Sequence, residues 1–451
     1  MDLAACASLE GDALLHALLG ATPVVDLELE DFLTAARARL LDAVTSATDG
    51  AWPPRFACAL ARQCFINEYV FACSANETAA IAALAARVTG SLARGEPPAS
   101  AQLTALACYQ PLCALAGAER LLEHRWPPEI DGLLTLQVRE PQEEQRLRAA
   151  IPQLTPIDDA VSQAVRAQYE ENPYPRWIKA PPARACLPVE AHLRSAFPHA
   201  DIRSPGPLPH PDILVAGCGT GQHPIDTAQS VAGARVLAVD LSTASLAYAL
   251  RKTRELRIET VDYAQADLLQ LGALARRFDV IEASGVLHHL ADPFAGWRAL
   301  LALLRPGGFM KLGFYSETAR RDIVRARELI AAAGFAETAE GIREARQYLR
   351  RIARAERIEG VLQGDFFSTS GCRDWLFHVQ EHRLTLDAIG AFLREHDLAL
   401  LGFQCGRATL QAYARRFAGD PAATDLACWR QFEREHPDTF GGMYQFWVQR
   451  R

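Results

Sequence analysis

A short glycine-rich segment at residues 217–221 constrains this chain more than any other feature. It reads Gly-Cys-Gly-Thr-Gly and directly follows the apolar run at 213–216, which is typical of a buried strand. A helical pattern comes next. Glycines let the backbone turn sharply and approach a ligand closely. The segment therefore predicts a strand, a ligand-binding turn and a helix, with the ligand at the carboxyl end of the strand.

Strand-like and helical patterns alternate from this point onward. The strand-like runs are ILVAG, ARVLAVD, FDVIEAS and GFMKLGFY, and another strand candidate precedes Ala266. Such alternation predicts βαβ units and a parallel sheet. Residues 1–150 instead show helical periodicity, with a late run at 101–122, and proline pairs interrupt it without a fixed repeat. We expect an α/β fold, a Rossmann-like sheet with an N-terminal all-α domain.

The chain is predicted to have five parts. They are an all-helical domain at 1–150, a helix with a proline- and aromatic-rich linker or lid at 151–211, a ligand-binding core at 212–316, an insertion or substrate cap at 317–397, and the last strands of the sheet at 398–451.

The spacing of the glycines narrows the choice of ligand. A dinucleotide fingerprint needs G-x-G-x-x-G/A, but Gln222 stands three residues after Gly219, which disfavours a nicotinamide oxidoreductase. The second strand candidate ends in Asp240, about 20 residues past the loop, where an acidic side chain accepts both hydroxyls of a ribose. The pattern favours a nucleoside-containing ligand.

Residues 213–316 resemble the core of class I S-adenosylmethionine-dependent methyltransferases. The G-x-G-x-G loop resembles the first motif of that family, residues 278–293 resemble its fourth motif in the form VLHHL-x-DP, and 305–308 resemble the turn before strand five. The resemblance implies S-adenosylmethionine as the cofactor. In the family, the loop packs on the amino-acid part of the cofactor, and an aspartate at the place of Asp267 meets the adenine amino group. The implied cofactor-binding residues are Gly217, Cys218, Gly219, Thr220, Gly221, Asp240, Leu241, Asp267, Leu268 and Ser284.

Candidate catalytic residues lie on the implied acceptor side. The cofactor is a sulfonium, so the protein's tasks are to align the acceptor, to exclude water and, where needed, to remove a proton. We expect His289, His288 and the lid residue Tyr174 to serve these tasks, although His289 equally suits a structural place before the next helix. Three residues at 378, 381 and 382 (His, Glu, His) are spaced for one helix face, and we expect them to face substrate or solvent rather than a metal ion.

An arginine-rich stretch runs from Arg320 to Arg357 with interleaved glutamates. Mixed charges at helical spacing indicate a salt-bridged face in solvent. The alternative is a docking face for an acidic protein or nucleic acid.

Bulk properties exclude several classes. The net charge is -7, so a nucleic-acid or membrane partner is not expected from charge. Acidic residues near the start do not suit a secretory signal, and no run approaches the ~18 apolar residues of a membrane span. The 11 cysteines contain no CxxC pair, which indicates reduced thiols in a cytoplasmic protein and no metal site.

The acceptor is decided outside the core. The arrangement resembles bacterial methyltransferases with a helical, tetratricopeptide-like region ahead of the catalytic domain, some of which modify protein lysines. We therefore expect a protein or peptide side chain as the methyl acceptor. A small-molecule methyltransferase of secondary metabolism and a non-catalytic cofactor-binding scaffold are the alternatives.

Overall fold

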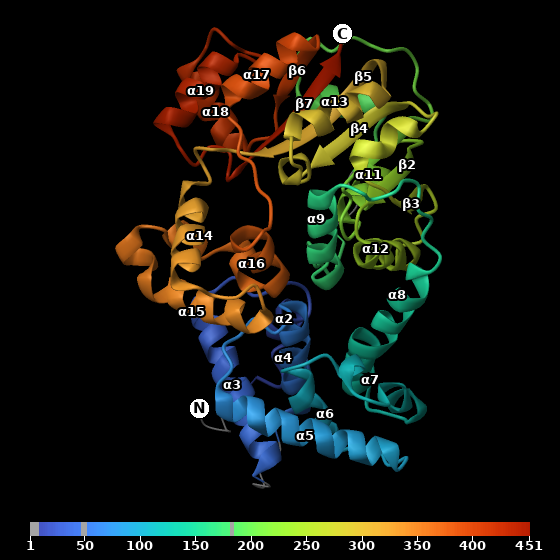
Figure 1. The fold of residues 1–451 in the computed structure, drawn as a ribbon, viewed down its shortest axis with the longest axis vertical. Coiled ribbons are helices and arrows are strands. Elements are labelled where there is room, and N and C mark those ends of the chain that lie inside the picture. The colour runs from blue at the N-terminus through green and yellow to red at the C-terminus, as the bar shows by residue number, and fades with distance from the viewer. Residues whose placement is uncertain (1–8, 47–51, 181–184) are drawn as a thin grey trace. The chain divides into compact units, whose positions relative to one another are not determined.

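The computed structural model describes residues 9–46, 52–180 and 185–451, and Figure 1 shows its helices and strands. The chain divides into two compact units. Unit 1 comprises Met1–Arg146, Tyr174–Ala180 and Arg325–Phe377. Unit 2 comprises Leu147–Pro173, Pro181–Val324 and His378–Arg451. In the part of the chain that the structure describes, no helix is long and apolar enough to cross a membrane.

Unit 1 is built from helices, as its apolar periodicity predicts. The start of α5 carries a capping box, in which the Ser74 hydroxyl and the Glu77 carboxylate accept backbone N–H groups reciprocally. The predicted helix at 101–122 is wrong in its second half: α6 ends at Ala107, and Pro111, which has no N–H, precedes a run of 3-10 turns. The helices are α2 (Ala13–Leu19), α3 (Leu27–Thr45), α4 (Pro54–Ile66), α5 (Ala75–Ala93), α6 (Ser100–Ala107), α7 (Pro128–Leu134), α8 (Glu140–Arg148), α15 (Ala339–Glu356) and α16 (Thr369–Leu376), and α14 (Arg321–Ala333) begins in unit 2.

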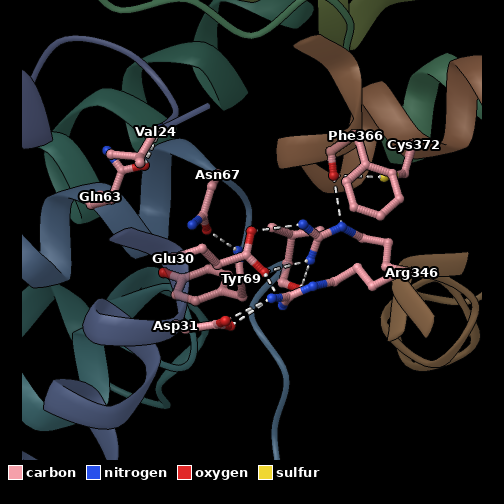
Figure 2. Close-up of polar contacts among 11 residues, drawn as sticks. Val24, Glu30, Asp31, Gln63, Asn67, Tyr69, Arg346, Phe366 and Cys372 are labelled. Atoms are coloured by element: carbon pink, nitrogen blue, oxygen red, sulfur yellow. Dashed lines mark hydrogen bonds and ion pairs between the residues drawn. The ribbon is translucent and has the colours of Figure 1, made fainter. Parts of the chain in front are cut away.

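A buried arginine joins the late helices of unit 1 to its N-terminal helices (Figure 2). The Arg346 guanidinium on α15 donates to both carboxylate oxygens of Glu30 on α3, at 3.2 and 2.7 Å. It also donates to the carbonyl oxygens of Phe366 at 2.6 Å and Val70 at 2.9 Å. Both charged side chains are fully buried, so their pairing is what makes this burial tolerable. Residues 325–377 are thereby part of the helical unit.

The arginine-rich stretch is only partly a solvent face. Arg325 fits that prediction, because it is exposed and pairs with two glutamates on its surface. The prediction is wrong for Arg346 and for Arg320, which is buried and pairs with the buried Glu381 at 2.6 Å. The buried and the exposed arginines of this stretch share the same helical spacing, so spacing alone does not show which of them are buried.

Unit 2 contains a seven-stranded sheet in the order β3-β2-β1-β4-β5-β7-β6. All neighbouring pairs from β3 to β5 are parallel, and β7 runs antiparallel to both β5 and β6. The strands are apolar because a parallel sheet is covered on both faces. Their bounds are β1 (Asp212–Ala216), β2 (Arg235–Asp240), β3 (Val261–Gln265), β4 (Phe278–Ser284), β5 (Leu304–Tyr315), β6 (Leu398–Phe403) and β7 (Met443–Arg450). The Rossmann-like α/β class predicted from the sequence is confirmed.

Helices cover both faces of this sheet. On one face Trp297, Phe392 and Trp429 pack into a large apolar cluster, and Figure 1 shows α17, α18 and α19 grouped beside β6. On the other face Leu193 and Leu246 pack over β1, β2 and β4. The helices of unit 2 are α9 (Ala160–Glu171), α10 (Val189–Ala196), α11 (Gln222–Ser230), α12 (Thr243–Glu255), α13 (Pro293–Leu303), α17 (Leu386–Glu395), α18 (Arg407–Arg416) and α19 (Leu426–Glu435).

The segment between β5 and β6 is divided between the units. Residues 325–377 belong to unit 1, and His378 begins the return to unit 2. The predicted helix face at 378–382 is wrong, because α16 ends at Leu376 and residues 377–383 contain no helix. Here His382 donates its backbone N–H to the carbonyl oxygen of His288 at 2.8 Å, which is a tertiary bond rather than a helical one.

Candidate active site

The glycine loop between β1 and α11 has a backbone that only glycine adopts without strain. Gly217, Gly219 and Gly221 have φ of 67°, 51° and 87°. A Cβ on Gly217 would lie 2.2 Å from a methyl group of Val286, in the loop after β4. The glycines therefore let the loop lie directly against the end of β4. The two residues between them, Cys218 and Thr220, are buried.

Asp240 at the end of β2 holds this loop from the side. Its Oδ2 accepts from the N–H of Gly219 at 2.8 Å, and its Oδ1 accepts from the N–H of Ser242 at 2.9 Å. Burial raises the pKa of the carboxyl group above its usual range, while these backbone bonds act in the opposite direction. Each carboxylate oxygen can accept a second hydrogen bond, so the side chain keeps the capacity to bind ribose hydroxyls. The next residue, Leu241, accepts from Gln265 through its carbonyl group.

Asp267 after β3 contains a buried acceptor atom that lacks a partner. Its Oδ1 accepts from the N–H of Leu269 at 3.0 Å, and its own N–H donates to Thr155 at 2.8 Å. Within the described residues, Oδ2 is buried without a hydrogen-bond partner. Buried acceptor atoms in proteins are normally paired with a hydrogen-bond donor. An adenine amino group supplies one, and the buried side chain of Leu268 provides an apolar neighbour. These residues fit the adenosine part of S-adenosylmethionine.

The loop after β4 brings its two histidines into contact with aromatic rings. Ser284 ends the strand, and a single 3-10 turn holds Leu287–His289. The His288 ring is completely buried and stacks on Tyr315, with 3.7 Å between centroids. Burial lowers the pKa of His288 well below its usual range, and His289 adds to this effect. His288 is therefore neutral and packed into the interior.

His289 lies in a hydrogen-bonded group of side chains that includes His378. Its Nδ1 lies 2.8 Å from the carbonyl oxygen of Gln380, so Nδ1 carries the proton that it donates. The His378 ring stacks on it at 3.6 Å and accepts from the Gln380 N–H through Nδ1 at 3.0 Å. His378 therefore holds its proton on Nε2, which lies 3.2 Å from the hydroxyl oxygen of Tyr169. The group reaches from the β4 loop to the end of α9.

The end of α9 also contacts the predicted ribose site. The Ser242 hydroxyl donates to the carbonyl oxygen of Tyr169 at 3.0 Å. The Glu170 carboxylate accepts from both the N–H and the hydroxyl group of Thr243, and so caps α12. The sequence does not mark Glu170 or Gln380 as site residues, because neither lies in a motif and their partners are distant along the chain. The helix expected within 151–211 is the sequence signal for this element.

Tyr174 groups with unit 1 rather than with the histidines. Its hydroxyl donates to Oδ2 of Asp365 at 3.0 Å, and Trp177 nearby is buried. The role of the segment as a lid stays a prediction.

The loop, the two aspartates and the parallel sheet define a nucleoside-binding Rossmann-like domain, and comparisons give its family. Residues 214–310 match the methyltransferase domain family. An uncharacterized protein of Synechococcus sp. is 34% identical over 176 residues, which are 39% of this chain and 42% of that protein. The ubiquinone biosynthesis O-methyltransferase of Methylocella silvestris is 34% identical over 122 residues, 27% of this chain and 46% of that protein.

Among solved structures, PKMT2 from Rickettsia typhi aligns with a TM-score of 0.47 and 15% identity, covering 58% of this chain and 52% of that chain. Its complex with AdoHcy aligns with a TM-score of 0.46 and 17% identity over 60% and 54%. The chain spans less than half of the length of the curated relatives above. Its core is a class I methyltransferase domain with S-adenosylmethionine as the cofactor.

Proposed function

We propose that the whole chain is an S-adenosylmethionine-dependent methyltransferase that transfers its methyl group in line to a side chain of a protein or peptide. Binding of the cofactor is supported by the buried, unpartnered Oδ2 of Asp267 and by the glycine loop, which Asp240 holds in place. The cofactor supplies an electrophilic methyl group on a sulfonium. The residues of the chain then align the acceptor and exclude water around the reacting atoms.

His289 is the proposed acceptor-side base. Its Nδ1–H donates to the Gln380 carbonyl group, which makes Nε2 the basic nitrogen of the neutral ring. Stacking on His378 holds the plane of the ring. An acceptor amine has a pKa of ~10.4 and must lose a proton before it attacks, and Nε2 would hold that proton. We place His288 beside it as packing that keeps the 3-10 turn rigid, and Tyr174 as a lid residue.

The protein or peptide acceptor is supported by the helical unit. Unit 1 draws together the N-terminal helices and residues 325–377 around the buried pair of Glu30 and Arg346. A methyltransferase core needs no such body to bind a small acceptor, because a cap of a few helices encloses one. We propose that unit 1 recognises the protein that carries the acceptor.

A small-molecule acceptor is the second candidate, and a specific finding favours it. Several matched relatives are named ubiquinone biosynthesis O-methyltransferases, and their alignments cover between 21% and 27% of this chain. The core they share holds the cofactor residues, while the acceptor depends on segments outside it.

One labelling experiment separates these functions. The purified chain is mixed with methyl-labelled S-adenosylmethionine and with either the protein fraction or the small-molecule fraction of a lysate lacking the enzyme. We expect label in the protein fraction, and none with Asp240→Asn as the enzyme. Label only in small molecules would replace the proposed acceptor. No label in either fraction, with cofactor binding intact by calorimetry, would leave a binding scaffold.

A further inference from the structure

A buried carboxylate on β4 joins three secondary-structure elements beneath the glycine loop. The Oε2 of Glu282 lies 2.9 Å from Nε2 of His223 and accepts from the Thr227 hydroxyl at 2.6 Å. His223 and Thr227 lie one turn apart on α11. The ammonium group of Lys311, on β5 opposite Glu282 in the register of the sheet, lies 3.3 Å from the same imidazole nitrogen. The cofactor-binding and catalytic residues that the family resemblance implies do not include these four side chains.

The protonation state of the group follows from its contacts. Burial alone would raise the pKa of Glu282, but His223 and then Lys311 lower it to about 2. Glu282 is therefore a carboxylate, which can only accept hydrogen bonds, so Nε2 of His223 carries a proton and donates it to Glu282. Lys311 supplies a positive charge close to the same buried anion. A charge-assisted bond of this kind is stronger than a neutral one.

The position of the group connects it to the cofactor loop. α11 begins at Gln222, directly after Gly221, and no side chain caps its start. The first turn of the helix is instead held by His223 through Glu282. Two residues beyond Glu282, β4 ends at Ser284 and leads to Val286, which packs against Gly217. One carboxylate thus ties the helix after the loop to the strand that lies against the loop.

We propose that Glu282 is a positioning residue for the cofactor: by holding His223 and Thr227 it sets the glycine loop relative to the end of β4, and the affinity for the cofactor depends on its charge. This inference rests on the proposed function only in that the chain must bind the cofactor. Glu282 touches no reacting atom. Its effect passes through α11 to the N–H groups and tight turns of Gly217, Gly219 and Gly221.

The test measures binding of S-adenosylhomocysteine to the full chain by calorimetry. We expect Glu282→Gln and His223→Gln each to raise the Kd about tenfold, because each removes one charge-assisted bond. We expect the double variant to be no worse than either single variant, because both substitutions break the same link. In the chain labelled with ¹⁵N-glycine, amide resonances of the loop should move in all three variants.

The matched control is Asp279→Asn, at the opposite end of β4. Asp279 is also a buried carboxylate, and it accepts from the Asp212 N–H and from Arg305, far along the strand from the loop. We expect this variant to lose stability while the Kd and the loop resonances stay unchanged. Folded Glu282→Gln with wild-type affinity, or equal losses in Asp279→Asn, would overturn the proposal. If Glu282→Gln does not fold, the Kd values of His223→Gln and Thr227→Val test the proposal in its place. No binding by the wild type would overturn the proposed function itself.

Discussion

Asp240 ends β2 and Asp267 follows β3, the neighbouring strand, but the two carboxylates are hydrogen-bonded differently. Both oxygens of Asp240 already accept backbone N–H groups, so this carboxylate shapes the loop as well as offering further acceptor capacity. Asp267 uses one oxygen for its own turn and leaves the other buried without a partner in the described structure. A buried acceptor oxygen without a hydrogen-bond donor is costly. The two aspartates should therefore respond differently to neutralisation.

Asp267→Asn tests the adenine contact. The amide keeps an oxygen for the Leu269 N–H and places an NH₂ group where Oδ2 stood, so two donors would face each other. We expect the Kd for S-adenosylhomocysteine to rise by about tenfold or more, measured by calorimetry. Asp425→Asn serves as the control, because Asp425 only caps α19. Unchanged affinity in folded Asp267→Asn would remove the adenine assignment.

Gly217→Ala tests the packing of the loop on the β4 end. The added Cβ would lie 2.2 Å from Val286 at a φ of 67°, which costs ~1–2 kcal/mol in conformation before any clash. We expect cofactor binding to be lost in equilibrium dialysis while the far-ultraviolet dichroism stays native. The double variant Gly217→Ala/Val286→Ala should regain part of the affinity. If it regains none, the contact with Val286 is not what requires glycine here.

At the scale of elements, buried ion pairs hold helices to distant partners in both units. In unit 1 the pair joins α15 to α3 through Arg346 and Glu30, which lie 316 residues apart in sequence. In unit 2 the Glu282 carboxylate joins α11 to β4 and β5. Breaking one partner of such a pair leaves an uncompensated buried charge, whereas replacing both by apolar side chains is often tolerated.

Arg346→Met should destabilise unit 1 by ~3–5 kcal/mol, because it removes the closest partner of the buried Glu30 carboxylate and leaves it the longer contact with Arg350, at 3.5 Å. Urea unfolding followed by dichroism measures this loss. The double variant Glu30→Met/Arg346→Met should recover most of it. Asp31→Asn is the control: Asp31 pairs with Arg350 at the surface, and its loss should cost no more than ~1 kcal/mol. Equal costs for the buried and the exposed pair would contradict the prediction.

The acid sensitivity of unit 2 should depend on Glu282. Its pKa is about 2 in the fold, against ~4.3 in an unfolded chain. Because the folded value is the lower one, the carboxylate stabilises the fold above about pH 4.3, and this contribution is lost as the pH falls toward about 2. The difference in unfolding free energy between wild type and Glu282→Gln should therefore shrink from about pH 5 to about pH 3. A constant difference would exclude this carboxylate as a source of acid sensitivity.

For the whole molecule, the division into two units predicts that the cofactor product and the buried pair of Glu30 and Arg346 affect the stability of different units. S-adenosylhomocysteine at about 100 times its Kd should stabilise the unit that binds it by ~2.7 kcal/mol. We expect this to raise the calorimetric transition of unit 2, whereas Arg346→Met should lower that of unit 1. If both changes act on one common transition, the units unfold as a single cooperative body, and the separation would be wrong.

The sequence by itself determined the fold and the cofactor of the α/β core of this protein. A glycine loop, an acidic residue at the end of the second strand and an alternation of strands with helices are local signals. A parallel sheet brings the carboxyl ends of its strands to one edge, so local spacing was enough to place Gly217 and Asp240 there. The family resemblance pointed to Asp267. The last strands of the sheet were expected within 398–451, and β6 and β7 lie there.

Only the tertiary structure decided which helices belong together and what surrounds the histidines. Arg346 looked like its exposed neighbours until its partner on α3 was known, because helical spacing carries no information about a residue 316 positions away. His378 came to His289 through an irregular segment where spacing had predicted a helix. No local sequence pattern indicated the role of Glu282, which lies within an apolar strand. Each of these depends on long-range packing, which brings together side chains that no local pattern relates.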